Sequence, residues 1–232
     1  MEQGVLYVVA TPIGNLADIS LRALEILKSC DLIISEDTRE TQKLLNHYKI
    51  AKSQLSYRDQ NHKTVFLKIL NELLHDKIVC LVCDSGTPLI SDPGFKLINE
   101  LRRNGFNNIS SVPGPSALIS ALSISGLPTD QFTFLGFLPK KEQDIAKLLE
   151  AHISSQGTLI FYESPLRVMS VLKLLLKLLG DRAASVCSEI TKSHESVHTG
   201  YISDIIKCFE NTAFKGEYVI LVAKKGFSYD KY

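Results

Sequence analysis

The sequence lacks the features of a membrane protein, a secreted protein and a polybasic nucleic-acid binder. Of its 232 residues, 26 are Lys or Arg and 25 are Asp or Glu, so the formal net charge is only +1. No apolar run approaches the ~18 residues of a transmembrane helix, and the first residues, Met-Glu-Gln-Gly, do not resemble a signal peptide. We therefore expect a cytoplasmic protein without a membrane partner, in which any nucleic-acid partner requires a local basic patch.

The sequence also lacks a disulfide framework and a metal-binding motif. The five cysteines are an odd number without framework spacing, which indicates reduced thiols. Cys80 and Cys83 match Cys-x-x-Cys, but positions i and i+3 of a strand point to opposite faces, so we interpret both as small core residues. The histidines are scattered, and we predict no metal site.

Apolar runs of strand length alternate with helical patterns in the first part of the chain, as in parallel α/β sheets. After Gly126-Leu127-Pro128, predicted strands are more often adjacent, which favours a mixed sheet. We therefore predict an α/β protein with two domains, residues 1–125 and 126–232. The first is expected to carry a mostly parallel sheet and the second a mixed one.

Three turn-rich loops follow apolar strands of the first part, at residues 11–15, 84–94 and 113–116. Ligands bind at the carboxyl ends of strands in open α/β sheets. Three loops with glycine and proline at one sheet edge therefore predict a pocket for a small organic ligand. Strand-to-helix connections also need turn residues for structural reasons alone. The nucleotide motifs G-x-G-x-x-G and G-x-x-x-x-G-K-[ST] are absent.

Polar clusters follow other predicted strands. Glu36, Asp37 and Arg39 lie at a strand-to-helix junction, where they can bind or activate a substrate. Acidic residues are also favoured there by the helix dipole, without any function. Further clusters occupy residues 161–167 and 191–195.

Taken together, these segments resemble one family. The strings that carry the resemblance are LYVVATPIGNL at residues 6–16, EDTR at 36–39, DSGTPLISDPG at 84–94, PGPSA at 113–117, GFLP at 136–139, FYES at 161–164 and KGE at 215–217. They resemble the small-subunit (16S) ribosomal RNA (cytidine-2′-O)-methyltransferases of the tetrapyrrole methylase superfamily. The resemblance covers residues 5 to about 224, and its first and third strings are highly specific.

The resemblance implies two α/β domains of the tetrapyrrole methylase type, with S-adenosyl-L-methionine bound in the cleft between them, and a homodimer. It implies methylation of the ribose 2′-hydroxyl of a cytidine in the decoding region of small-subunit ribosomal RNA. With so little net charge, we expect the substrate to be an assembled or nearly assembled small ribosomal subunit.

The resemblance also suggests roles for individual residues. Those expected to bind the cofactor are Pro12, Gly14, Asp84, Gly86, Thr87, Pro88, Ile90, Ser116, Ala117 and Tyr162. Candidates for the substrate chemistry are Glu36, Asp37, Arg39, Glu163 and Lys192. Lys192 is a candidate base only if burial lowers its pKa, and Arg39 is expected to hold a phosphate through bidentate contacts. Basic residues considered for RNA contact are Lys140, Lys141, Arg167, Arg182 and Lys215, although each is more often a solvated surface charge.

Two departures from the family pattern and three alternatives accompany this interpretation. The family often has His-x-x-Asn-Glu where this chain has Arg58-Asp59-Gln60-Asn61-His62, and Ser196 stands where an acid usually follows Glu195. One alternative is a methylase of the same superfamily that acts on a tetrapyrrole or another small substrate. The others are a magnesium-dependent phosphotransfer enzyme with Asp84 as nucleophile and a non-catalytic RNA-binding protein.

Overall fold

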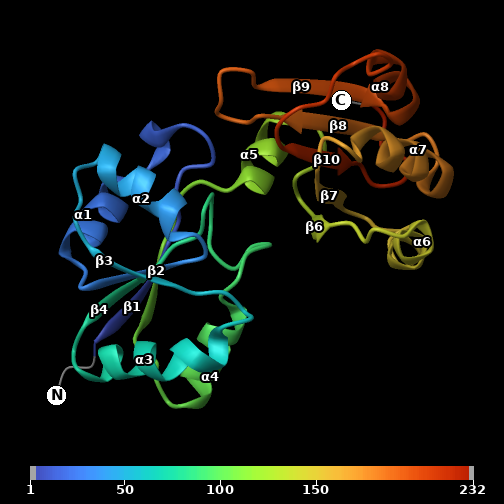
Figure 1. The fold of residues 1–232 in the computed structure, drawn as a ribbon. Helices are drawn as coiled ribbons and strands as arrows, with labels where there is room; N and C mark the ends of the chain where they lie inside the picture. Colours follow the sequence, from blue (N-terminus) through green and yellow to red (C-terminus); the bar gives the residue numbers. More distant parts are fainter. Residues whose placement is uncertain (1–3, 230–232) are drawn as a thin grey trace. The chain divides into compact units, whose positions relative to one another are not determined.

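A computed structural model describes residues 4–229 of the chain. The chain divides between Ser116 and Ala117 into two compact units, each built on a five-stranded sheet (Figure 1). Helix α5 (Ala117–Ile124) packs against strands of the second sheet and belongs to the second unit. The observed division therefore lies before this helix, whereas the boundary predicted at Gly126 lies after it. No helix within residues 4–229 is long and apolar enough to cross a membrane.

The first sheet is entirely parallel, as predicted, with strand order β3-β2-β4-β1-β5. Its strands are β1 (Val5–Val9), β2 (Leu32–Ser35), β3 (Ser53–Ser56), β4 (Ile78–Leu81) and β5 (Ile109–Val112). Edge strand β3 was not predicted, because Ser-Gln-Leu-Ser carries a single apolar side chain. The carboxyl ends of all five strands meet at one edge of the sheet, where the predicted loops begin.

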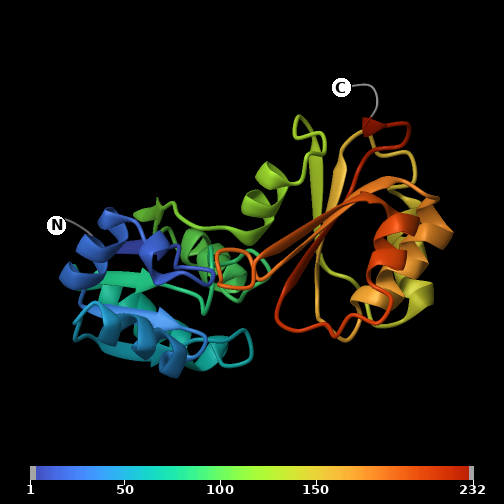
Figure 2. The ribbon, with the colours of Figure 1, turned by 90° about the horizontal axis from the view of Figure 1, so that it is seen from above.

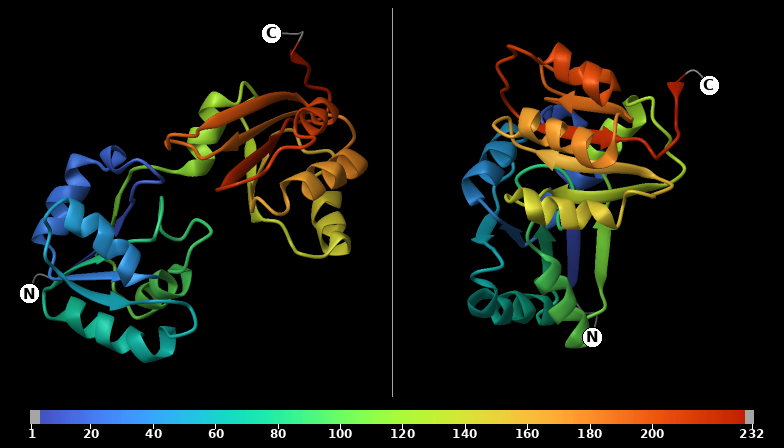
Figure 3. Two further views of the ribbon diagram at one scale, coloured as in Figure 1. Left: turned by 45° about the horizontal axis from the view of Figure 1, so that its top comes forward. Right: turned by 90° about the vertical axis from the view of Figure 1, so that its right-hand side faces the viewer.

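Two pairs of helices cover the faces of this sheet (Figures 1 and 3). The pairs are α1 (Leu21–Ser29) with α2 (Thr38–His47), and α3 (His62–Leu74) with α4 (Phe95–Arg103); a 3₁₀ turn, η1, spans Leu16–Asp18. Strand side chains alternate between the two layers, because successive residues point to opposite faces. Ile33 packs with the α1–α2 pair, and Leu32 and Ile34 pack with α3 and α4.

The second sheet is mixed, as predicted, with strand order β6-β7-β10-β8-β9. Strands β6 and β7 are parallel, and the remaining pairs are antiparallel. The strands are β6 (Phe132–Phe137), β7 (Thr158–Glu163), β8 (Ala183–Ser188), β9 (Ser196–Tyr201) and β10 (Tyr218–Val222).

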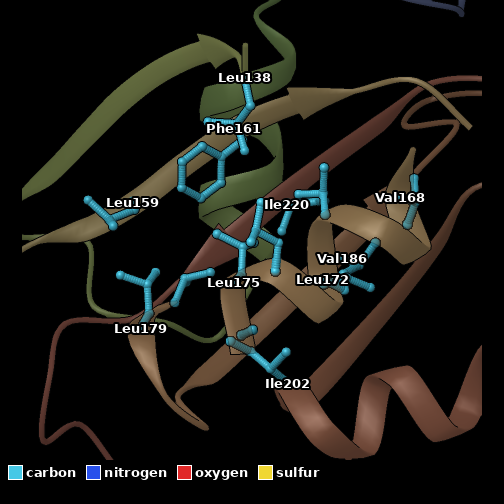
Figure 4. Packing of buried hydrophobic residues seen from close by; sticks show 14 of the residues in the cluster. Leu138, Leu159, Phe161, Val168, Leu172, Leu175, Leu179, Val186, Ile202 and Ile220 are labelled. Atoms are coloured by element: carbon cyan, nitrogen blue, oxygen red, sulfur yellow. The ribbon is translucent and has the colours of Figure 1, made fainter. Parts of the chain in front are cut away.

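Three helices cover one face of the second sheet, and α5 lies on the other (Figure 2). They are α6 (Glu142–Glu150), α7 (Val168–Leu179) and α8 (Ile202–Cys208). Leu172 and Leu175 of α7 are fully buried with Phe161 of β7 and Ile220 of β10 (Figure 4). Burying one such side chain contributes about 1.5–3 kcal/mol, so α7 is a main source of stability in this unit.

Candidate functional site

The three predicted loops lie together at the carboxyl edge of the first sheet. Thr11 and Gly86 exchange two backbone hydrogen bonds, of 2.8 and 3.1 Å, between the loops after β1 and β4. The Thr87 hydroxyl donates a hydrogen bond of 3.0 Å to the Pro115 carbonyl, which joins the loop after β4 to the loop after β5. The loops therefore form one continuous wall.

Glycines allow these loops to approach one another closely. Gly86 has a φ of 84°, and a Cβ atom there would lie 3.2 Å from the Ile13 side chain. A Cβ atom on Gly114 would lie 3.0 Å from the Cβ atom of Ala10. At these two positions a side chain larger than that of glycine would require the neighbouring loop to shift.

The loop between Asp84 and Gly94 has an unusual backbone. Leu89 and Ser91 are left-handed, with φ values of 74° and 65°, a conformation that is costly for residues other than glycine. Behind the loop, the buried Cys83 thiol donates hydrogen bonds to the carbonyls of Ser85 and Gly86. Strained backbone of this kind persists where the surroundings hold it and is concentrated at ligand sites.

Asp37 connects the loop after β2 to this wall. It is the N-cap of α2, and its carboxylate accepts a hydrogen bond of 2.9 Å from the Arg39 backbone N–H. The same carboxylate forms a bidentate ion pair with the Arg39 guanidinium. The Asp37 backbone N–H donates to the Asp84 carboxylate at 3.2 Å. The Arg39 interactions hold the pKa of Asp37 well below its usual range, so Asp37 is a poor proton acceptor.

The last residue of β3 and the segment after it hold the backbone of Glu36 in place. The Ser56 hydroxyl and the Arg58 guanidinium donate to the Glu36 carbonyl at 3.1 and 3.3 Å. The Tyr57 hydroxyl contacts His62 Nδ1 at 2.9 Å, and His62 Nε2 contacts the Glu100 carboxylate. His62, which departs from the family pattern, is buried and bridges Tyr57 and Glu100.

The carboxylates at this sheet edge have perturbed proton affinities. Burial raises the pKa of Asp84, although the hydrogen bond from the Asp37 backbone N–H acts against it. Burial, followed by the nearby Glu36 charge, raises the pKa of Asp92 to about 6. Sequence reasoning did not identify Asp92 as a titrating group, because the partial burial of its side chain is a tertiary property.

In the second unit, Tyr162 and Glu163 lie at the end of β7. The Tyr162 hydroxyl accepts a hydrogen bond of 3.1 Å from the Leu118 N–H in the first turn of α5. The buried Glu163 carboxylate accepts from the Ser164 N–H at 2.8 Å and lies 3.5 Å from the Arg167 guanidinium. Glu163 therefore stabilises the turn after β7, and its burial argues against a role as the base.

Two expectations about basic residues in the second unit need correction. Partial burial acts to lower the pKa of Lys192, but ion pairs with Glu217 and Glu189, at 2.8 and 2.9 Å, outweigh it and raise the pKa. The condition for Lys192 as a base is not met.

Arg182 is not on the surface. It is only 6% exposed and donates to the carbonyls of Leu179 and Ile153, so it joins the end of α7 to the turn after α6. Arg167 likewise donates to the carbonyls of Leu138 and Pro139. Lys140, Lys141 and Lys215 are exposed.

Residues 5–206 match the family model described as Tetrapyrrole (Corrin/Porphyrin) Methylases. The chain belongs to this family. Methylases of the family use S-adenosylmethionine, and this enzyme is a methyltransferase.

Curated relatives agree over nearly the whole chain. Proteins named "Ribosomal RNA small subunit methyltransferase I" from Thermotoga maritima and from Hydrogenobaculum sp. are 42% and 44% identical. The alignments cover 96% and 97% of this methylase and 99% and 98% of the relatives. The relative of the same name from Halalkalibacterium halodurans is 41% identical, with 97% of this chain and 78% of the relative covered.

Solved structures show the same fold at low sequence identity. The crystal structure of diphthine synthase matches the methylase with a TM-score of 0.75 at 14% identity, covering 97% of this chain and 92% of that one. Uroporphyrin-III-C-methyltransferase from Thermus thermophilus matches with a TM-score of 0.62 at 18% identity, covering 96% and 93%. At this level of identity, the two matches support only the fold and not the function.

The carboxyl edge of the first sheet has features that fit S-adenosylmethionine, whose sulfonium and ammonium groups are cations. In addition to burial, the charges of neighbouring carboxylates act to raise the pKa values of Asp84 and Asp92, and these charges would stabilise a cation bound beside them. Ile90 is 40% exposed beside them and offers an apolar surface. Of the predicted cofactor residues, those from Pro12 to Ser116 lie in the first unit, and Ala117 and Tyr162 lie in the second. Their contact with the cofactor stays a prediction.

Proposed function

We propose that this methylase transfers a methyl group to the ribose 2′-hydroxyl of a cytidine in the decoding region of small-subunit ribosomal RNA. The observation that carries the proposal is identity of 41–44% over nearly the whole chain to relatives named for small-subunit ribosomal RNA methylation. The strings at residues 6–16 and 84–94 support the ribose hydroxyl as the acceptor, through the resemblance stated above.

The protein contributes chiefly by positioning the reactants. S-adenosylmethionine supplies the activated methyl group when bound, and alignment of the acceptor oxygen lowers much of the barrier. In this proposal Asp84, on the loop that also carries Thr87 and Ile90, faces the cationic groups of the cofactor. Asp37 fixes Arg39, and Arg39 holds a phosphate of the RNA.

We propose that Glu36 is the general base that accepts the proton of the 2′-hydroxyl. Of the five candidates, Asp37 has a depressed pKa, Glu163 is buried and Lys192 is a paired cation. Arg39 is a cation at any relevant pH. The Glu36 carboxylate forms no ion pair with any residue from 4 to 229, and its backbone is held by Ser56 and Arg58. It is the candidate whose group remains available as a general base.

The direct test is methyl transfer to small ribosomal subunits that lack the modification, followed by nucleoside analysis by mass spectrometry. The proposal expects 2′-O-methylcytidine from the wild-type protein, a loss of about 10²–10⁴-fold in turnover for Glu36→Gln, and unchanged S-adenosylmethionine affinity for that variant. A methyl group on the base, or transfer only to a tetrapyrrole, would contradict it. Full turnover by Glu36→Gln would remove Glu36 as the base and leave the substrate assignment standing.

We also propose that the enzyme is a cytoplasmic homodimer that acts on assembled or nearly assembled subunits. A net charge of +1 provides little general attraction to free RNA, so recognition depends on local groups and on the shape of the subunit. Sedimentation of the free enzyme tests the dimer. Tight, salt-insensitive binding to naked RNA would argue against the assembled subunit as substrate.

A further inference from the structure

An open pocket of about 490 Å³, lined by polar and charged residues, lies along α2 beside edge strand β3. Its lining residues are Thr38, Arg39, Gln42, Lys43 and Asn46 of α2 and Gln54 of edge strand β3. The helical residues recur at intervals of four, so they form one stripe about 12 Å long. The stripe begins at Thr38 and Arg39, which belong to the proposed catalytic segment, and runs away from it.

Three side-chain amides form a directed chain across this pocket. Gln54 Nε2 donates to Gln42 Oε1, and Gln42 Nε2 donates to Asn46 Oδ1 at 2.7 Å. Gln54 Oε1 is buried and has no hydrogen-bond partner among the residues the structure describes. A buried acceptor without a partner is unfavourable, so this end of the chain is prepared to accept a hydrogen bond from a ligand. Amides offer both the donors and the acceptors that base edges require.

Two cations border the amide chain. The side chains of Arg39 and Lys43 are 85% and 72% exposed. Arg39 uses two of its five N–H groups on Asp37, which leaves others for a second anion. Lys43 pairs with Glu40 at 2.8 Å, but exposed pairs of this kind contribute little and can be exchanged for a phosphate.

We propose that this pocket binds a nucleotide that neighbours the methylated one in the RNA. Lys43 and Arg39 contact phosphate, and the Gln54, Gln42 and Asn46 amides contact the edge of an unpaired base. Unpaired bases are the usual target of base-specific RNA recognition, because their edges are accessible. The inference rests on the proposed function and adds a substrate-binding site to it.

The test measures steady-state methyl transfer to unmethylated small ribosomal subunits at several salt concentrations. Lys43→Ala is expected to raise KM about 3–10-fold and to reduce the slope of log KM against log salt by about 0.7, the value for one phosphate contact to single-stranded RNA. Gln42→Ala and Gln54→Ala are expected to raise KM about 5–10-fold without changing the slope, because amides release no counterion. All effects should fall on KM rather than kcat.

Lys68→Ala is the matched control, because Lys68 is an exposed lysine on α3, which packs on the opposite face of the same sheet. It removes the same charge and should leave KM and the salt slope unchanged. Thermal melting and S-adenosylmethionine affinity, measured for each variant, detect damage to the fold. If Gln54→Ala is destabilised, the KM of the Gln42→Ala variant alone tests the role of the amides.

Two outcomes would overturn the pocket. If Lys43→Ala and Lys68→Ala change KM equally, Lys43 acts only through the overall charge of the protein and does not contact a phosphate in the pocket. If the glutamine variants keep the wild-type KM, the amides do not contact a base. Absence of methyl transfer by the wild-type enzyme would refute the proposed function and the RNA pocket with it. Normal transfer that is insensitive to the pocket variants would refute the pocket alone.

Discussion

Replacing Asp92 by Asn should stabilise the protein above pH 6 while leaving it nearly unchanged near pH 4. Burial, aided by the charges of Glu36 and Asp84, raises the pKa of Asp92 from 3.8 to about 6. The folded protein therefore holds a proton at pH values where the unfolded chain has released it. This contribution to stability is full below pH 3.8 and is lost as the pH rises through 6.

The magnitude follows from the size of the shift. A difference of about 2 pKa units corresponds to about 3 kcal/mol at 1.36 kcal/mol per unit. Because Asp92 keeps contact with solvent, screening reduces this figure to about 1–2 kcal/mol. An uncharged Asn avoids the cost of ionisation, so Asp92→Asn should be more stable by that amount at pH 8. The corresponding rise in Tm is about 2–8 °C for a chain of this length.

Urea unfolding of the wild-type and variant proteins from pH 4 to pH 8 measures the effect, and hydrogen exchange of the loop at residues 84–94 localises it. The two compact units can unfold separately, so the effect belongs to the transition of the first one. Asp130→Asn removes an exposed carboxylate of the second unit and serves as the control. A variant that is less stable than wild type at pH 8, or a gain in stability that does not change with pH, would show that ionisation of Asp92 does not destabilise the folded protein.

Three further outcomes follow from the structure. Leu175→Ala should lower the free energy of unfolding by about 2–5 kcal/mol, because it empties a fully buried site in the second core; denaturant titration checks this, and a loss below 1 kcal/mol would contradict it. Gly114→Ala should weaken S-adenosylmethionine binding in calorimetry, because the new Cβ atom meets Ala10 at 3.0 Å; unchanged affinity would show that the wall can shift. Asp37→Ala should reduce methyl transfer while cofactor affinity is retained, because it releases Arg39; wild-type turnover would exclude Asp37 from the site.

Much of the fold could be predicted, because its signals are local. Runs such as Ile78–Leu81 are buried strands, and turn residues after them mark the carboxyl edge of the sheet. Strand β3 escaped prediction because an edge strand with one apolar side chain has little local signal, and its place is decided by pairing with β2. The compact units part before α5, since that helix buries Leu118, Ala121 and Leu122 and lies against β7 and β10.

The family, the α/β architecture and the segments that form the candidate site could be read from the sequence, because these depend on residue order and spacing. Tertiary structure alone decided the state of each side chain. Lys192 is paired with two carboxylates, Arg182 is buried, Asp37 is bound to Arg39 and Asp92 is protonated more readily than an ordinary aspartate. Burial and proximity set these properties, and both arise only when distant parts of the chain come together.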